Sequence, residues 1–231
     1  MTPLILCYGG TFDPVHTGHL AIARAVRDAL HADVHLLPAA DPPHKGPTHA
    51  DAEQRARMLE LAVQGEAGLV VDRRELHRPG PSYTFDTLRE LRAELGPHAQ
   101  LVWMVGGDSV FELDTWHRWR ELFDHAHLLA IARPGAPIEE AGLAARAPAV
   151  AAELAPRWCL PAQLHALPAG GFAEFRLGAE RPESSTELRR RIAAGDSRWK
   201  DWVAPAVADF ITDHRLYAAD AFTSPADGPL V

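Results

Sequence analysis

Two histidines three residues apart are the first side chains in this sequence that could do chemistry on a phosphate. His16 and His19 lie in the run GGTFDPVHTGH, residues 9–19. At this spacing both imidazoles fall on one face of the first turn of a helix, and Gly18 leaves no side chain between them. A helix N-terminus adds free amides and the positive end of a dipole. We therefore predict a phosphate-binding loop with two imidazole donors.

Two other interpretations of this loop stay open. The glycines and histidines could serve only the packing of a strand-to-helix turn. Alternatively, His16 and His19 could bind a transition metal together with Asp13, although no fourth ligand stands nearby. Neither a G-x-x-x-x-G-K-[ST] loop nor a G-x-G-x-x-G fingerprint occurs in the chain. A phosphate site here would therefore differ from both of these common nucleotide-binding motifs.

A second candidate anion site lies far along the chain, in the run SSTELR at residues 184–189. Ser184 and Glu187 have the spacing of a capping box, which predicts a helix start. Arg189 falls near the first turn, where a cation opposes the helix dipole by about 0.3–1 kcal/mol. A bound anion would reverse that effect, and capping and anion binding are compatible. We predict that this helix start and the one near His16 converge on one polyphosphate.

Together the two segments resemble the signatures of the nucleotidyltransferase superfamily. The H-x-G-H core at residues 16–19 is similar to the first signature, and SSTELR is similar to the [IS]-S-x-x-x-R signature of the adenylyltransferases. The resemblance covers about residues 4–217, and Glu183 departs from it where Ile or Asn is more usual. Further segments narrow the resemblance to the bacterial nicotinate-nucleotide adenylyltransferases: PPHK at 42–45, GPSYT at 80–84, DTL at 86–88, GGDS at 106–109, Trp116, and RPG at 133–135.

This resemblance implies a reaction and its partners. Members of the family join ATP to nicotinate mononucleotide, giving nicotinate adenine dinucleotide and pyrophosphate in NAD biosynthesis. Mg²⁺ is expected on the ATP phosphates, without direct protein ligands. The attacking phosphate has a second pKa of about 6 and is largely dianionic at neutral pH, so no protein base or covalent nucleophile is needed. Catalysis then consists of positioning and charge stabilisation.

The resemblance also implies a role for each candidate residue. The catalytic set is His16, His19 and Arg189. The ATP-binding set is Gly9, Gly10, Thr11, Gly18, Gly106, Asp108, Arg133, Ser184, Ser185 and Thr186. Within that set, Asp108 is expected at the ribose hydroxyls or the magnesium shell, and Arg133 at the adenine unless its Arg-Pro-Gly run is only a turn. For the mononucleotide we expect Lys45 at a phosphate, Thr84 at the nicotinate carboxylate and Trp116 stacked on the pyridine ring. Core packing is the alternative for Trp116.

These residues need a scaffold that brings strand ends to one edge. Apolar runs predict strands at 4–8, 34–37, 69–71, 101–105, 127–132 and 175–177. Periodicity and caps predict helices at about 18–30, from Asp51, from Ser82 or Thr84 to Gly96, from Ser184 to Gly195, and at about 203–211. In the third of these, Leu95 is expected to face inward with Phe85, Leu88 and Leu91. The alternation predicts an α/β fold, a Rossmann-like doubly wound parallel sheet with a small C-terminal helical region. Ligands would then bind at the carboxyl ends of the strands.

The length of 231 residues predicts one domain. We assign a single nucleotidyltransferase domain to residues 1–217. Within it, the Ala- and Pro-rich stretch 136–168 is predicted to be a peripheral insertion with short helices, and 184–217 is the C-terminal helical region. Residues 218–231 are predicted to be a disordered tail.

Composition disfavours several classes of protein. With 23 Lys and Arg against 31 Asp and Glu, the net charge of −8 disfavours nucleic-acid binding. The two cysteines, Cys7 and Cys159, form no C-x-x-C pair, which disfavours a disulfide framework and a cysteine zinc site. No apolar run is long enough for a signal peptide or a membrane span, so a cytoplasmic location is expected. The sequence leaves the oligomeric state open, a homo-oligomer included.

Two rival functions remain at this stage. One is a sister transferase that acts on pantetheine phosphate, a sugar or alcohol phosphate, or nicotinamide mononucleotide. Trp116 and the segment 80–88 argue against the first two substrates, whereas the amide is harder to exclude. The other rival is a non-catalytic NAD or ATP sensor, which is disfavoured because His16, His19 and Arg189 are all present.

Overall fold

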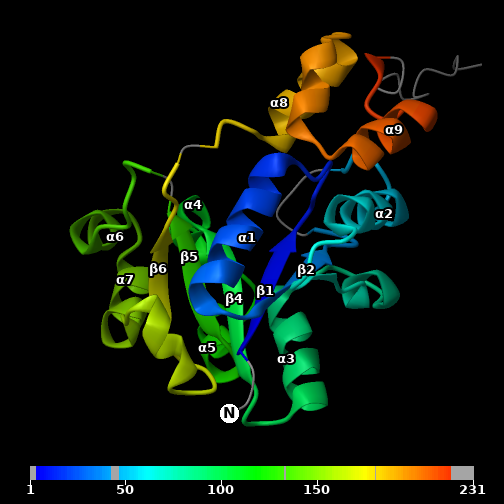
Figure 1. The fold of residues 1–231 in the computed structure, drawn as a ribbon. Helices are drawn as coiled ribbons and strands as arrows, with labels where there is room; N and C mark the ends of the chain where they lie inside the picture. Colours follow the sequence, from blue (N-terminus) through cyan, green and yellow to red (C-terminus); the bar gives the residue numbers. More distant parts are fainter. Residues whose placement is uncertain (1–3, 43–46, 133, 180, 220–231) are drawn as a thin grey trace, which may run out of the picture.

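One parallel sheet forms the centre of the molecule. The computed structural model describes residues 4–42, 47–132, 134–179 and 181–219 (Figure 1). Within these residues, six strands pair in parallel in the order β3-β2-β1-β4-β5-β6. The strands are β1 Leu4–Gly10, β2 Asp33–Pro38, β3 Leu69–Val71, β4 Gln100–Gly106, β5 His127–Ala132 and β6 Phe172–Arg176. The predicted Rossmann-like α/β fold is confirmed.

The strand order places a switch point between β1 and β4. The chain builds β2 and β3 on one side of β1 and then returns to place β4 on the other side. Tyr8 of β1 is in register with Leu36 of β2 and Met104 of β4. The loops that follow β1 and β4 therefore leave the same edge of the sheet as neighbours, which is where open α/β sheets bind ligands.

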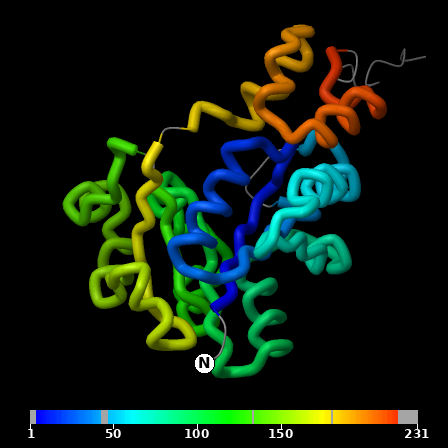
Figure 2. Tube along the Cα trace, in the orientation of Figure 1, coloured from blue at the N-terminus to red at the C-terminus, as the bar shows by residue number. Residues whose placement is uncertain are grey.

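Helices cover both faces of the sheet (Figures 1 and 2). The helices are α1 Thr17–Leu30, α2 Ala52–Val63, α3 Thr84–Leu95, α4 Gly107–Val110, α5 Leu122–His125, α6 Glu140–Arg146, α7 Pro148–Leu154, α8 Ser185–Ala193 and α9 Pro205–Asp213. Side chains of α1, α2, α8 and α9 share one apolar cluster with alternate residues of β1. Those of α3, α5, α6 and α7 share the other cluster. In Figure 2 the C-terminal helices (orange to red) lie near the first turn of α1.

Most predicted elements are present, with shifted bounds. The last strand ends at Arg176 rather than spanning 175–177, and the predicted C-terminal helix begins only at Pro205. Short helices occupy 140–154 as expected, and their Leu143, Val150 and Leu154 side chains are buried. Residues 220–231 of the expected tail lie outside the described residues.

One prediction about α3 was wrong, and of the two starts that the sequence offered, Thr84 is the one observed. Leu95 is 40% exposed rather than inward, because the helix ends there and the chain turns away at Gly96 with φ 86°. Ser82 does not begin the helix, since its Oγ accepts the backbone N–H groups of Ala40 and Asp41 and ties α3 to the loop after β2. Tyr83 stands at the N-cap instead.

No helix in the described part of the chain combines the length and the apolar character that crossing a bilayer requires.

Candidate active site

The two histidines form a reciprocal cap at the start of α1. The backbone N–H of His19 donates to Nδ1 of His16 at 3.3 Å, and the N–H of His16 donates to Nδ1 of His19 at 3.2 Å. The rings stack with centroids 3.6 Å apart. This arrangement is a capping box built from imidazoles instead of Ser and Glu. Because each Nδ1 accepts a proton, the neutral rings carry their own proton on Nε2, where it can be donated.

Burial keeps His16 uncharged. Its side chain is 6% exposed, and this burial lowers the pKa of His16 to about 4, although the charge of Glu183 raises it in part. His16 is therefore neutral near pH 7. The start of α1 thus offers a phosphate N–H donors and a helix dipole, without a charge on this ring.

The metal interpretation of this loop finds no support in the structure. The Asp13 carboxylate, 4% exposed, accepts the N–H of His49 at 2.9 Å, the N–H of Ala50 at 3.2 Å and the hydroxyl of Tyr217 at 2.8 Å. Asp13 is thus engaged with other segments. Among the described residues, no group of three or more His, Cys, Asp or Glu is placed to hold a metal ion.

The second helix start is capped as predicted, but only from one side. Ser184 Oγ accepts the backbone N–H of Glu187 at 3.2 Å. The reciprocal half of the predicted capping box is absent, because the Glu187 carboxylate binds Arg190 at 2.6 Å and Arg191 at 2.9 Å. Glu187 thereby pairs with Arg190 and Arg191 of α8 and not with the backbone N–H of Ser184.

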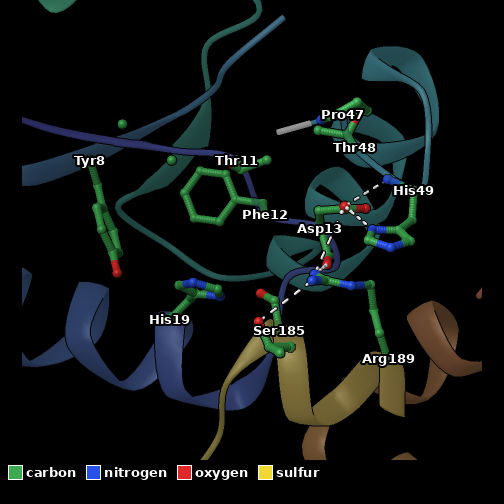
Figure 3. A pocket seen from close by; sticks show the side chains of 13 residues that line it. Tyr8, Thr11, Phe12, Asp13, His19, Pro47, Thr48, His49, Ser185 and Arg189 are labelled. Carbon is green, nitrogen blue, oxygen red and sulfur yellow. Dashed lines mark hydrogen bonds and ion pairs between the residues drawn. The ribbon is translucent and has the colours of Figure 1, made fainter. Parts of the chain in front are cut away.

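The two helix starts meet, as predicted from the two motifs. Arg189 of α8 donates to the backbone carbonyl of Asp13 at 2.5 Å, and Ser185 Oγ donates to the carbonyl of Pro14 at 2.9 Å. Figure 3 shows Arg189 and Ser185 directed at this loop from α8, with His19 approaching from α1. The guanidinium and the imidazoles therefore share one site.

A third link between these segments passes through Glu183, the residue that departs from the family pattern. Thr17 Oγ1 donates to Glu183 Oε1 at 3.0 Å, and Glu183 Oε2 is buried without a hydrogen bond to any described residue. A side chain at Gly18 would begin 3.3 Å from that oxygen and 3.0 Å from Nδ1 of His16. Glycine at 18 therefore leaves room for both groups, as expected.

A cavity of about 370 Å³ opens between these elements (Figure 3). Seven predicted residues line it: Gly9, Gly10, Thr11, His19, Ser185, Thr186 and Arg189. Tyr8, Phe12, Asp13 and residues 47–49 complete the wall. His16, Gly18 and Ser184 lie at the two helix starts but do not line the cavity. The cavity thus joins the loop after β1 to the first turns of α1 and α8.

The other predicted residues occupy different places. Gly106 ends β4 and Asp108 lies in α4, at the neighbouring strand end. Thr84 is the first residue of α3, and Trp116 is partly buried against the apolar cluster of that face. Lys45 and Arg133 lie outside the described residues.

Two of the predicted glycines have a packing reason to be glycine. A side chain on Gly9 would collide with the ring of Trp103, and one on Gly10 would begin 2.9 Å from the ring of Phe12. By contrast, a side chain on Gly106 would meet only Ser109, at 3.9 Å. The packing interpretation of the first loop therefore holds for residues 9 and 10, alongside their place in the cavity wall.

Arg55, which no motif in the sequence predicted, is fully buried next to the loop that lines the site. Its guanidinium donates to the carbonyls of Thr11 at 2.7 Å, Ala40 at 3.2 Å and Ala50 at 3.2 Å. Burial lowers the pKa of Arg55 below its usual value. A signal was present, because Arg55 lies on the apolar face of α2, in step with buried residues three, four, seven and eight positions later.

Tyr217 and His49 were also missed as partners of Asp13. Tyr217 is 204 residues from Asp13 in the sequence. No local spacing links residues so far apart, so only the folded chain reveals the contact.

The sequence of this chain is similar to a known protein family and to named relatives. A family model described as cytidylyltransferase-like matches residues 7–191. A curated relative from Stenotrophomonas maltophilia, named as a probable nicotinate-nucleotide adenylyltransferase, is 49% identical over 94% of this chain and 98% of its own. One of the same name from Laribacter hongkongensis is 48% identical over 93% of this chain and 94% of its own.

The fold is also similar to solved structures. Plasmodium falciparum nicotinic acid mononucleotide adenylyltransferase, complexed with NaAD, superposes with a TM-score of 0.71. The match covers 93% of this chain and 97% of that chain at 16% identity, and it therefore supports the shared fold.

Proposed function

The chain belongs to the nicotinate-nucleotide adenylyltransferase family, and from that premise we propose how its residues carry out the reaction. It transfers the adenylyl group of ATP to nicotinate mononucleotide, giving nicotinate adenine dinucleotide and pyrophosphate, a step of NAD biosynthesis. The observation that carries the proposed mechanism is the meeting of the starts of α1 and α8 at one cavity.

The chemistry needs positioning more than proton transfer. A phosphate oxygen of the mononucleotide forms a bond to the α-phosphorus of ATP while the bond from that phosphorus to the pyrophosphate oxygen breaks. The attacking oxygen is already deprotonated at neutral pH, and pyrophosphate is a good leaving group. The protein therefore has to align the two phosphates and stabilise the charge that builds up on the leaving oxygens.

We assign the direct imidazole contact to His19. His19 lines the cavity and carries its proton on Nε2, so it can donate to a phosphate oxygen. His16 is buried behind it and holds that tautomer through its own backbone N–H. In this assignment His16 orients the donor, and His19 stabilises the transition state.

Arg189 and the hydroxyls of α8 are assigned to the departing pyrophosphate. Arg189, 18% exposed at its side chain, lines the cavity together with Ser185 and Thr186. A guanidinium binds phosphate with two parallel N–H groups, which suits a leaving group with several charged oxygens. To do so, Arg189 must turn away from the carbonyl of Asp13.

We propose that magnesium enters with ATP. The donor set supports this assignment, because no carboxylate or imidazole cluster among the described residues could hold the ion and the Asp13 carboxylate is already hydrogen-bonded. When bound, the ion would neutralise charge on the polyphosphate.

The mononucleotide is assigned to the region of Thr84 and Trp116. Thr84 begins α3, where free backbone amides favour an anion such as the nicotinate carboxylate. Trp116 is only partly buried, which leaves part of its ring surface accessible for stacking on the pyridine. Lys45, Arg133, Gly106 and Asp108 keep the roles that the family resemblance implies.

Pyrophosphate release by the purified protein tests this function. With ATP, magnesium and nicotinate mononucleotide we expect release of pyrophosphate and formation of the dinucleotide in equal amounts. With nicotinamide mononucleotide in place of the acid we expect a lower kcat/KM, because buried donors that face a carboxylate disfavour an amide. Absence of pyrophosphate with the acid would refute the function, and equal kcat/KM values would refute the assignment of the carboxylate site.

A further inference from the structure

Tyr217 brings the C-terminal end of the described chain into the active site. Its side chain is 1% exposed, and its hydroxyl donates to Oδ1 of Asp13 at 2.8 Å. Its ring lies 6.5 Å from that of His49, which belongs to the cavity wall. A residue four positions beyond the end of α9 thus reaches the loop that follows β1.

The backbone on both sides of this hydrogen bond is held in an unfavourable conformation. Tyr217 has φ 63° and Arg215 has φ 51°, both in the left-handed region that side-chain-bearing residues avoid. Phe12, which immediately precedes Asp13, has φ 49°. Strained positions of this kind persist where surrounding contacts fix them, and they cluster at functional sites. The chain therefore accepts strain at Tyr217 and at the residue that precedes Asp13.

Backbone N–H groups and the Tyr217 hydroxyl, and not Arg189, donate hydrogen bonds to the Asp13 carboxylate. Oδ1 accepts the hydroxyl of Tyr217 and the N–H of Ala50, and Oδ2 accepts the N–H of His49. Arg189 Nη1 lies 3.9 Å from Oδ2, beyond hydrogen-bond distance, and donates to the backbone carbonyl of Asp13 instead. A buried carboxylate and a guanidinium thus stand side by side without a direct hydrogen bond.

The hydroxyl of Tyr217 remains a donor throughout the physiological pH range. Burial raises the pKa of Tyr217, and the neighbouring Asp13 charge raises it further. The contact therefore remains a phenol donating to a carboxylate, a strong type of hydrogen bond.

We propose that Tyr217 is a positioning residue, which satisfies the Asp13 carboxylate so that Arg189 stays available to the phosphates of ATP. Without the hydroxyl, the N–H of Ala50 would be the one hydrogen bond left to Oδ1 among the described residues. The under-satisfied carboxylate would then draw Arg189, whose Nη1 lies 3.9 Å from Oδ2, into a tight ion pair. ATP would then have to break that pair. This inference rests on the proposed function, because it assigns ATP to the cavity that Arg189 lines.

Tyr217→Phe tests the proposal, since it removes the hydroxyl and keeps the ring. We expect the KM for ATP, and the Kd for ATP measured by calorimetry without the mononucleotide, to rise about tenfold, within the range for losing a hydrogen bond to a charged group. The KM for the mononucleotide should stay within twofold. Thr212→Val is the matched control, because it removes another hydroxyl of the C-terminal region, which donates to the carbonyl of Ala208, and it should leave both KM values unchanged.

The Asp13→Asn background separates positioning from simple structural support. Asp13 lines the cavity, so the Asp13→Asn variant is itself the reference for this comparison. An amide has no charge with which to hold Arg189, so adding Tyr217→Phe to Asp13→Asn should change the KM for ATP less than twofold. A tenfold effect of Tyr217→Phe that persists in the Asp13→Asn background overturns the proposal.

The outcomes also separate this inference from the proposed function. A wild-type protein that releases pyrophosphate, with a Tyr217→Phe variant of unchanged KM, would refute the inference and leave the function standing. A wild-type protein that releases none would refute the function. Should Tyr217→Phe fail to fold, Tyr217→Met, which also removes the hydroxyl, is measured in its place: a tenfold rise in the KM for ATP supports the proposal and an unchanged KM overturns it.

Discussion

At the scale of single residues, His16 is a neutral imidazole although it stands at a candidate phosphate site. His16 caps α1 through Nδ1, which it can do only while that nitrogen is unprotonated. Protonation would break the cap and place a charge in a buried position. In the proposed mechanism the histidines therefore act as oriented N–H donors, and Arg189 supplies the positive charge.

His16 should make the stability of the protein depend on pH. Its folded-state pKa of about 4 lies below the ordinary value of 6.5, so the unfolded chain binds a proton that the folded chain rejects. The contribution of His16 to the free energy of unfolding is therefore fully present above about pH 6.5 and is lost as the pH falls toward about 4. In urea unfolding, lowering the pH from about 7 to about 5 should cost the wild type about 2 kcal/mol more than it costs His16→Asn.

Asparagine is the suitable replacement because it also caps helices well. Other histidines with lowered pKa values, such as His35 and His127, are common to both proteins and cancel in the comparison. Identical pH dependence of the two proteins would show that His16 is not held neutral by the fold.

His19→Ala should reduce catalysis far more than stability. Removing a donor to a developing phosphate charge is expected to lower kcat by about 10²- to 10³-fold. The lost cap to the His16 N–H should cost about 1 kcal/mol, or roughly 2–4 °C in melting temperature. Steady-state kinetics and thermal unfolding check this, with the exposed His98→Ala as a control. Parallel loss of folding and activity would instead favour a packing role.

The positions of the candidate residues at helix starts were predictable, whereas their supports were not. His16, His19 and Arg189 lie in compact motifs whose spacing alone places each at a helix start. The roles of Asp13 and Tyr217 depend on a contact across 204 residues, which periodicity cannot show. The local part of the site was therefore visible in the sequence, and the part that holds it together was not.

At the scale of elements, α2 supports the loops of the site through one buried guanidinium. Arg55 satisfies carbonyls in the loop after β1, in the loop after β2 and at the residue before the N-cap of α2. Loops carry backbone groups that must find partners when they are buried. A single side chain with several donors does this at a junction where no strand pairing is available.

Arg55→Lys should therefore destabilise the protein although the charge is kept. An ammonium cannot reproduce the fork that contacts three separate carbonyls, and at least one carbonyl is left without its donor. We expect the free energy of unfolding to fall by about 3 kcal/mol in urea denaturation, with an unchanged m-value. Arg57→Lys, at a half-exposed position of the same helix, should change it by less than about 0.5 kcal/mol. Equal effects of the two substitutions would contradict this role for Arg55.

Element starts were easier to predict than element ends. Asp51 with Gln54, and Ser184, cap their helices as expected, because capping is a local hydrogen bond that the sequence spells out. Leu95 was misplaced since its exposure depends on where α3 stops against its neighbours. Of the two starts offered for α3, Thr84 is the one observed, because a distant loop takes the hydroxyl of Ser82.

At the scale of the whole molecule, the proposed ATP site joins segments from the two ends of the described chain. The loop after β1 is held by the sheet centre, and α8 reaches it only after the chain has passed through β6. The regular alternation of strands and helices predicted the class of this fold. The strand order could not be predicted from periodicity, because each apolar run suits any buried position in a parallel sheet.

Binding of ATP between the loop after β1 and the start of α8 should stabilise the whole domain. ATP with magnesium, at about one hundred times its Kd, should raise the free energy of unfolding by about 2.7 kcal/mol. Arg189→Met should need a much higher ATP concentration for the same gain. Arg190→Met, on the next and exposed residue of α8, should behave as the wild type. Equal ATP dependence of the two variants in thermal unfolding would argue against ATP at this cavity.

The contact between Tyr217 and Asp13 has a consequence for synthesis. A nascent chain that contains only the first strands already has both imidazoles, but it does not yet have the guanidinium of Arg189 that meets their loop. Arg189 arrives late, and the tyrosine that keeps it available arrives later still. A chain that ends before residue 189 therefore lacks the guanidinium that meets the first loop, and one that ends before residue 217 lacks the hydroxyl that binds Asp13.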